Sequence, residues 1–385
     1  MGRYRQVVLI VLSTMGVSPA ALGQTAEAPP IVSPDVQPGG QVVFRIKAPE
    51  AREVRVKSPD IPGITKENAA LKKGKDGIWE ATLGPVPAGA YRYNFDLDGV
   101  LVIDPRNPSN SESNNNVWSL VLVPGAAFMD TRPVPHGAVS EVTYYSTVLQ
   151  RFRRMHVYTP PGYGTTPTKY PVFFLLHGSS DSDNSWSTVG RAGFILDNLI
   201  AEKKARPMIV VMPHGHTTAI RTPSNNEDFA REFLTDIAPT IERDYRVSPG
   251  RANRAIAGLS MGGGQSLLIA IPNLDRFGYV GVFSSSMPGM ARPASAPPAT
   301  PSAPGPTFEE KHKVALSDAK SKKGLKLFWI ATGKDDFGVE NTRKTVELLK
   351  GYGFSPEYHE SEGGHVWMNW RDYLNLFAPR LFQGK

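Results

Sequence analysis

The stretch that decides the fold is Ala257-Gly258-Leu259-Ser260-Met261-Gly262-Gly263. It follows an apolar run that predicts a strand (255–258) and precedes a segment of helical character (262–270). Its G-x-S-x-G pattern is typical of a sharp strand-to-helix turn, because the glycines leave room for neighbouring backbone while the serine is exposed. The following helix would point its N-terminus at the site and favour developing negative charge. The pattern predicts a nucleophilic serine, Ser260; the alternative is an ordinary turn serine.

Strand-like and helix-like runs alternate around this segment, from about residue 139 onward. The run 172–176 is apolar throughout, which indicates a strand buried on both faces of its sheet. We therefore predict an α/β fold, a sheet covered by helices, over residues 143–385. The expected strands are 172–176, 208–212, 255–258, 280–284 and 327–331, and the expected helices are 193–204, 226–245, 262–270 and 340–352.

The preceding region has a different pattern, with short alternating runs separated by turn residues. Residues 90–97 place Tyr91, Tyr93, Phe95 and Leu97 on one face, and Asp98-Gly99 then predicts a hairpin. We predict an all-β, immunoglobulin-like β-sandwich over residues 24–124. A Pro- and Gly-containing linker, 125–142, is expected to join it to the α/β domain.

The first residues have the order of a secretory signal peptide. Arg3 and Arg5 precede the apolar run 7–12, and small residues follow as far as Gly23. The apolar run is much shorter than the roughly 18 residues that span a bilayer. We expect residues 1–23 to be removed, leaving a secreted or periplasmic chain without membrane association; an uncleaved N-terminal anchor is the alternative.

Composition excludes several classes of protein. The chain has no cysteine, which excludes disulfide scaffolds, cysteine nucleophiles and thiolate-bound metal centres. Its net charge of +7 comes without a dense basic run, so nucleic acid is not an expected partner. His214-Gly215-His216 suggests a metal site, but no third ligand stands at recognisable spacing, so we expect neither a metal nor a cofactor.

A serine nucleophile needs a base, and in this order of elements an acid and then a histidine follow the serine. His359 and His365 compete for the role of base. His365 is preferred because it follows Glu362-Gly363-Gly364, a flexible loop, whereas His359 lies in a short strand-like run. Asp335 and Asp336 follow the strand 327–331, and spacing alone does not distinguish them.

The transition state also needs donors for its oxyanion. We assign the backbone N–H of Met261, next to the nucleophile, and that of Ser179, in the loop after the strand 172–176. His177 is expected to shape this loop at the edge of the substrate site. Trp186 and Trp367 are candidates to stack on an aromatic substrate, with core packing as the alternative for both.

With these residues, the chain resembles a secreted feruloyl esterase of carbohydrate esterase family 1, within the esterase D-like α/β-hydrolases. The resemblance implies that Asp336, three residues after Gly333, is the acid. It implies hydrolysis of feruloylated xylan or a small phenolic ester through an acyl-enzyme on Ser260. The sandwich is similar to a family 48 carbohydrate-binding module. The resemblance is carried by 134–137, 157–163, 176–178, 258–263 and 363–367, and in the sandwich by 77–79 and 104–108.

Other functions remain open at this point. An acetylxylan esterase and an enterochelin-type siderophore esterase use the same catalytic residues on different esters. A non-catalytic polysaccharide-binding protein could retain the fold, although the intact Ser260, Asp336 and His365 argue against it. The Pro/Ala-rich segment 288–306 is expected to be either a flap over the site or a solvated loop.

Overall fold

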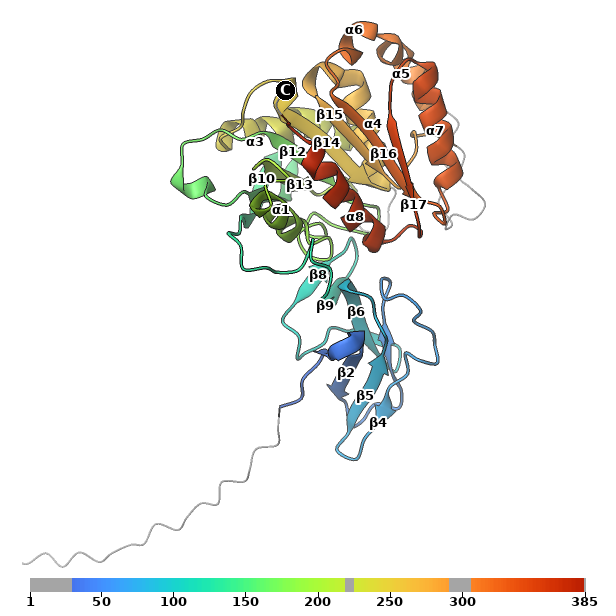
Figure 1. Ribbon diagram of the computed structural model, residues 1–385. Helices are drawn as coiled ribbons and strands as arrows, with labels where there is room; N and C mark the ends of the chain where they lie inside the picture. Colours follow the sequence, from blue (N-terminus) through green and yellow to red (C-terminus); the bar gives the residue numbers. More distant parts are fainter. Residues whose placement is uncertain (1–29, 219–224, 291–305, 384–385) are drawn as a thin grey trace, which may run out of the picture. The chain divides into compact units, whose positions relative to one another are not determined.

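The computed structural model describes residues 30–218, 225–290 and 306–383 (Figure 1). The described residues from Val32 onward belong to one compact unit. The predicted signal peptide and most of the Pro/Ala-rich segment lie outside the described residues. In the part of the chain that is described, no helix is both long enough and apolar enough to cross a bilayer.

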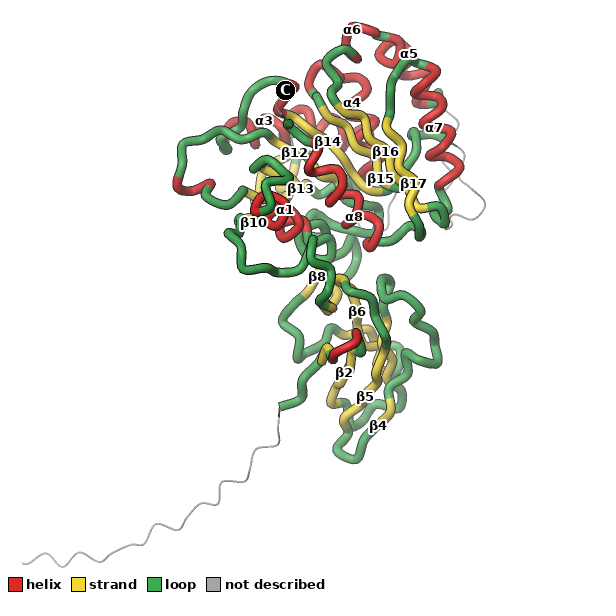
Figure 2. The backbone as a smooth tube through the Cα atoms, viewed as in Figure 1, coloured by secondary structure: helices red, strands yellow, loops and turns green. Residues whose placement is uncertain are grey.

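The described residues from 30 to 123 form two antiparallel sheets. Among these residues Figure 2 shows strands and loops with one short helical turn. One sheet has the order β1-β2-β5-β4 and the other β3-β6-β9-β8, with β7 paired to β6. Their strands are β1 Asp35–Val36, β2 Val42–Lys47, β3 Val54–Lys57, β4 Lys72–Lys73, β5 Ile78–Leu83, β6 Gly89–Leu97, β7 Val100–Val102, β8 Asn110–Glu112 and β9 Val117–Val123.

Alternation along β6 builds the core between the two sheets. Tyr91, Tyr93 and Phe95 are almost fully buried and pack with residues of β2 and β5, as the sequence predicts. Asp98 and Gly99 both have positive φ, 48° and 92°, which is the conformation of the predicted hairpin turn between β6 and β7. The predicted β-sandwich is therefore confirmed.

The remaining strands form one eight-stranded sheet in the order β10-β11-β13-β12-β14-β15-β16-β17. All neighbours from β13 to β17 are parallel, whereas β10 and β11 add antiparallel pairs at one edge. The strands are β10 Ala138–Ser146, β11 Arg151–Thr159, β12 Val172–Leu176, β13 Ile209–Pro213, β14 Arg254–Leu259, β15 Tyr279–Phe283, β16 Leu327–Gly333 and β17 Glu357–Ser361.

Helices cover both faces of this sheet (Figure 1). In β12, Val172, Phe174 and Leu176 face a core shared with α4, α5 and α7, while Phe173 and Leu175 face a second core shared with α1 and α8. Burial on both faces explains the uninterrupted apolar run, and the predicted α/β fold is confirmed. The helices are α1 Ala192–Ala201, α2 Asn226–Glu232, α3 Ala238–Asp244, α4 Met261–Ala270, α5 Phe308–Ser317, α6 Ala319–Lys322, α7 Val339–Gly351 and α8 Trp367–Phe377.

Two elements differ from the sequence prediction. The expected helix 226–245 is divided, with a π-helical turn, Phe233–Ile237, between α2 and α3; Pro239, which lacks an N–H, stands just after this turn. The strand β10 begins at Ala138, inside the predicted 125–142 linker.

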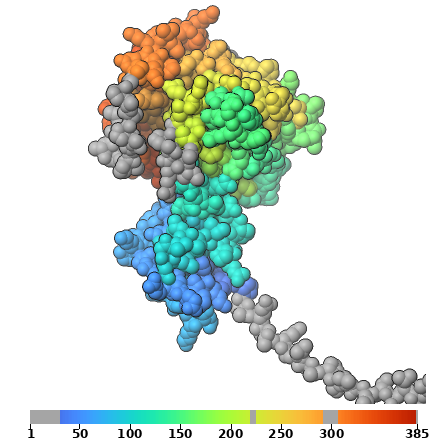
Figure 3. All heavy atoms as spheres, turned by 180° about the vertical axis from the view of Figure 1, so that it is seen from behind, coloured from blue at the N-terminus to red at the C-terminus, as the bar shows by residue number. Residues whose placement is uncertain are grey.

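The blue-to-cyan atoms and the green-to-red atoms gather separately in Figure 3, so each region is built from a continuous stretch of chain. The exact domain boundaries stay a prediction.

Phe174→Ala should destabilise the chain by about 3–5 kcal/mol, because it removes a fully buried ring from the centre of the sheet. Phe152→Ala is the matched control, since the Phe152 side chain is 74% exposed and its loss should cost far less. Urea unfolding of both variants measures the difference. Equal destabilisation would contradict the described core.

Candidate active site

Ser260 stands between β14 and α4 in a strained backbone conformation, with φ 50° and ψ −116°. The glycines around it are required by space. A Cβ on Gly258 would lie 2.4 Å from the backbone of Gly262, and one on Gly262 would lie 2.6 Å from the carbonyl oxygen of His177. The G-x-S-x-G pattern therefore exists because three backbone segments meet here without room for a side chain.

His365 links Ser260 to Asp336. Its Nε2 lies 3.0 Å from Ser260 Oγ, and its Nδ1 lies 2.9 Å from Asp336 Oδ2. The His365 side chain is 20% exposed, whereas the Asp336 carboxylate is fully buried. Three residues from separate loops are thus joined by two hydrogen bonds, and the serine lies at the accessible end of this chain of contacts. A base that contacts a serine hydroxyl and is itself held by an acid activates that hydroxyl as a nucleophile.

The surroundings of Asp336 favour its ionised carboxylate. Burial alone would raise the pKa of its carboxyl, but the hydrogen bond and charge of His365 and the N–H of Gly338 outweigh burial and lower it. The neighbouring Asp335 has an exposed side chain, and its backbone N–H donates to Gly363. Of the two candidate acids, the structure brings Asp336 to the histidine.

The competing histidine lies in a different environment. His359 is part of β17, half-buried, and its ring stacks on Trp329 with centroids 5.9 Å apart. His365 lies in the loop between β17 and α8, as its glycine-rich context predicts. Sequence reasoning missed Phe337 and Trp370, whose rings contact the His365 imidazole with centroids at 4.5 and 5.1 Å. The position of Phe337 directly after Asp336 is the only local signal.

Both predicted oxyanion donors belong to segments that meet at Ser260. Met261 begins α4, and the first amides of a helix have no partner within it. The loop after β12 lies against the nucleophile, because a Cβ on Gly178 would be 3.5 Å from Ser260 Cβ. The peptide between Gly178 and Ser179 therefore borders the serine, where the N–H of Ser179 is expected to act.

Residues 146–381 match a family model described as "Putative esterase". The chain belongs to this esterase family. The match begins at the last residue of β10 and ends beyond α8, so it includes all three residues of the Ser260–His365–Asp336 line.

Several known proteins resemble this esterase. An endo-1,4-beta-xylanase/feruloyl esterase of Xylanibacter ruminicola is 31% identical over 379 residues, which are 95% of this chain and 47% of the relative. The chain thus spans about half the length of that relative. A solved ferulic acid esterase of Anaeromyces mucronatus, in complex with ferulic acid, is 26% identical with a TM-score of 0.55, covering 67% of this chain and 96% of its own. The enterobactin esterase of Shigella flexneri shares the fold, at 19% identity and a TM-score of 0.59, covering 89% of this chain and 93% of its own.

The predicted stacking roles of Trp186 and Trp367 are corrected by the structure. Both indoles are buried, at 0% and 3% exposure, and they pack edge to face with each other at 5.1 Å. Trp186 Nε1 donates to the carbonyl oxygen of Leu176 at the end of β12. Both tryptophans therefore have a packing role, because they lie in the core that α1 and α8 share with the sheet.

His177 shapes the oxyanion region without facing the substrate, since it is 1% exposed. Its Nδ1 donates to Gly178 O and its Nε2 accepts the N–H of Gly215, both at 2.8 Å. Burial lowers the pKa of His177 to about 4 and that of His216 to about 4. His177, His214 and His216 lie together, but no group of described residues in this esterase has the arrangement of a metal site.

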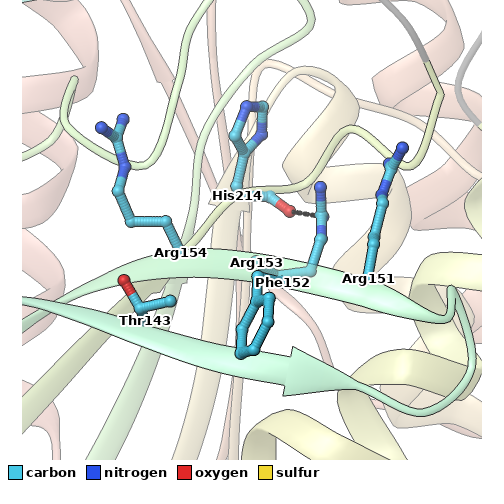
Figure 4. Close-up of a pocket in the computed structure, with 6 residues that line it drawn as sticks. All are labelled: Thr143, Arg151, Phe152, Arg153, Arg154 and His214. Atoms are coloured by element: carbon cyan, nitrogen blue, oxygen red, sulfur yellow. Dashed lines mark hydrogen bonds between the residues drawn. The ribbon is translucent and has the colours of Figure 1, made fainter.

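A pocket of about 410 Å³ lies beside β11 and His214, the residue that follows β13 (Figure 4). None of Ser260, Asp336 and His365 lines it. Arg153 donates to the carbonyl oxygen of His214 and pairs with the buried Glu232, so its charge is already compensated. The lining residues are Thr143, Arg151, Phe152, Arg153, Arg154 and His214.

Asp336→Asn should lower kcat on the order of 10⁴-fold, because the amide would donate to His365 Nδ1 and favour the wrong tautomer. Asp335→Asn is the matched control and should change kcat by less than about twofold, since its side chain is exposed. Steady-state ester hydrolysis measures both. A larger loss in the control would move the acid by one residue.

The free energy of unfolding should decrease as pH falls from 6.5 to about 4. In that window the unfolded chain protonates His177 and His216, whereas the folded chain keeps them neutral, so protons favour the unfolded state. Urea unfolding at several pH values measures the slope. His177→Gln should have a shallower slope than the wild type; an identical slope would show that His177 does not titrate in this way.

Proposed function

We propose that this chain is a serine carboxylic-ester hydrolase of the feruloyl esterase type. The observation that carries the proposal is the position of His365, whose two ring nitrogens bridge Ser260 Oγ and the buried Asp336 carboxylate. A nucleophile, a base and an orienting acid in this relation favour acyl transfer over simple ligand binding. Ser260 and His365 are both partly exposed, so an ester can reach them.

In the proposed acylation step, Ser260 Oγ attacks the ester carbonyl carbon while His365 Nε2 accepts the hydroxyl proton. Asp336 holds the proton on His365 Nδ1 and stabilises the imidazolium that forms. The tetrahedral oxyanion accepts hydrogen bonds from the N–H groups of Met261 and Ser179. His365 then gives its proton to the leaving alcohol, and the acyl group remains on Ser260.

Deacylation uses the same residues with water in place of the alcohol. The oxygen of the water attacks the acyl carbon while His365 Nε2 accepts a proton from that water. The second tetrahedral intermediate collapses, His365 returns the proton to Ser260 Oγ, and the carboxylic acid leaves. No cofactor enters either step.

We propose hydroxycinnamate esters as the substrate class, either feruloylated xylan or a small phenolic ester. The support is the similarity to the Xylanibacter ruminicola relative, which is named a feruloyl esterase, and to the Anaeromyces mucronatus enzyme solved with ferulic acid. Phe337, half-buried beside His365, offers an aromatic surface next to the reacting atoms. The resemblance to enterobactin esterase concerns the fold, which makes a catecholate ester the second candidate to test.

The sandwich aromatics favour a structural role. Tyr91, Tyr93 and Trp79 are all buried in the sandwich core, where they cannot stack on a sugar. Within the motif at 104–108 the carboxylate of Asp104 is internal, since it is buried and accepts hydrogen bonds from Ser33 and Tyr93, whereas Pro105, Arg106 and Pro108 are exposed. If the sandwich binds xylan, as its similarity to a family 48 module implies, it does so with residues other than these buried aromatics and Asp104.

We also propose that the esterase acts outside the cytoplasm. The support is the order of residues 1–23, basic, then apolar, then small, together with the absence of cysteine from the whole sequence. Mass spectrometry of the protein exported by a bacterial host, showing an N-terminus near Gln24, is the direct test.

Ser260→Ala should lower turnover on the order of 10⁶-fold while leaving the thermal unfolding temperature within a few degrees. Wild-type initial rates on methyl ferulate, acetylated xylan and a catecholate trilactone test the substrate class, and methyl ferulate should give the highest kcat/KM. Ordinary turnover by Ser260→Ala would exclude Ser260 as the nucleophile. A higher kcat/KM on either of the other esters would replace the proposed specificity.

A further inference from the structure

We propose that Arg92, a residue of the sandwich, positions the oxyanion donor of the esterase through a buried ion pair with Asp181. This inference rests on the proposed function, because it assigns a role within the same active site. The oxyanion loop is defined here as residues 177–183, which follow β12. This role of Arg92 means that the sandwich helps to position an active-site donor, in addition to any role in binding a polymer.

The ion pair is almost completely removed from solvent. Arg92 Nη1 donates to Asp181 Oδ1 at 2.8 Å, and its Nε donates to Asp60 Oδ2 at 2.7 Å. The side chains of Arg92, Asp181 and Asp60 are only 6%, 1% and 7% exposed. Burial alone would lower the pKa of Arg92, but the two carboxylates raise it, so the guanidinium stays charged.

Asp181 in turn fixes the peptide that carries the donor. The backbone N–H of Asp181 donates to Gly178 O at 3.1 Å, and His177 Nδ1 donates to the same oxygen at 2.8 Å. The Gly178 carbonyl and the Ser179 N–H belong to one planar trans peptide and point in opposite directions. Two donors that hold the oxygen therefore also aim the N–H.

The aimed peptide borders the nucleophile. A Cβ on Gly178 would lie 3.1 Å from Asp181 Oδ2 and 3.5 Å from Ser260 Cβ, so this residue lies between the carboxylate and the serine. A shift of Asp181 would consequently move the Ser179 N–H relative to Ser260. Catalytic hydrogen bonds to an oxyanion are sensitive to such displacements because their energy depends on preorganised geometry.

The sandwich also holds the loop through its backbone. Ser113 forms an antiparallel bridge with Asp181, and the N–H of Asn114 donates to Ser180 O at 3.1 Å. The carbonyl oxygen of Glu112 accepts the hydroxyl of Ser182 in the loop, and directly after the loop it accepts the hydroxyl of Ser185 while the Glu112 N–H donates to Asn184. The end of β8 thus extends the contact along the oxyanion loop. Arg154, which pairs with both Glu112 and Asp183, and Arg92 add ion pairs to this contact, and of the two only Arg92 belongs to the sandwich.

A purely structural interface would show the same contacts, so the test must separate catalysis from folding. The variants are Arg92→Met and Asp181→Asn in the full chain. Arg371→Met is the matched control, because Arg371 is also a buried arginine that joins the sandwich to the α/β region. It donates to Ala90 O and Val189 O without contacting Asp181.

Arg92→Met should lower kcat on methyl ferulate by about ten- to a hundredfold, with KM changed by less than about threefold. Arg92→Lys should restore part of kcat, because it keeps a charge near Asp181 but lacks the fork that joins both carboxylates. Arg371→Met should retain kcat within about threefold of the wild type, whatever its thermal stability.

Asp181→Asn is nearly isosteric, so it tests the proposed role of the ion pair if Arg92→Met fails to fold. It should lower kcat at least severalfold with little change in KM. Wild-type kcat in folded Arg92→Met, or in Asp181→Asn when Arg92→Met does not fold, would overturn the inference. An equal loss in Arg371→Met would also overturn it. The proposed function is judged separately, since its failure would appear as a wild type without esterase activity.

Discussion

The site depends on a close approach of backbone at the end of the central strands. The turn after β14, the first turn of α4 and the loop after β12 come so near to one another that Gly258 and Gly262 have no space for a side chain. This approach forces Ser260 into its strained conformation and brings the Gly178–Ser179 peptide beside it. Because β14 and β16 are parallel and end at the same edge of the sheet, short loops are enough to bring the acid Asp336 and the base His365 to Ser260.

Local sequence predicted the features, in the site and in the sandwich, that local geometry controls. The G-x-S-x-G turn, the glycine-rich loop before His365 and the Asp98-Gly99 hairpin each have a conformation that few residue types allow, so their sequences are informative. The doubly buried strands were recognisable for the same reason, because burial on both faces leaves no polar position. The division of the helix 226–245 was missed, since its apolar period continues across the π-helical turn.

Long-range contacts could not be predicted in this way. Arg92 and Asp181 are 89 residues apart, and nothing in either neighbourhood indicates that a sandwich arginine pairs with the loop after β12. Trp186 and Trp367 stand on segments near the rim, yet tertiary packing turns both indoles into the core. Long-range contacts also decide the place of β10 and β11. These two strands form antiparallel pairs at the edge of a sheet whose other strands lie later in the chain.

Trapping of the nucleophile tests the central claim most directly. A fluorophosphonate probe reacts with a serine oxygen only when a neighbouring base activates it, and the modified residue can be located by peptide mass spectrometry. The account predicts one modification per chain, on the peptide that contains Ser260, and none after a His365→Ala substitution. Modification of another serine, or equal labelling without His365, would contradict it.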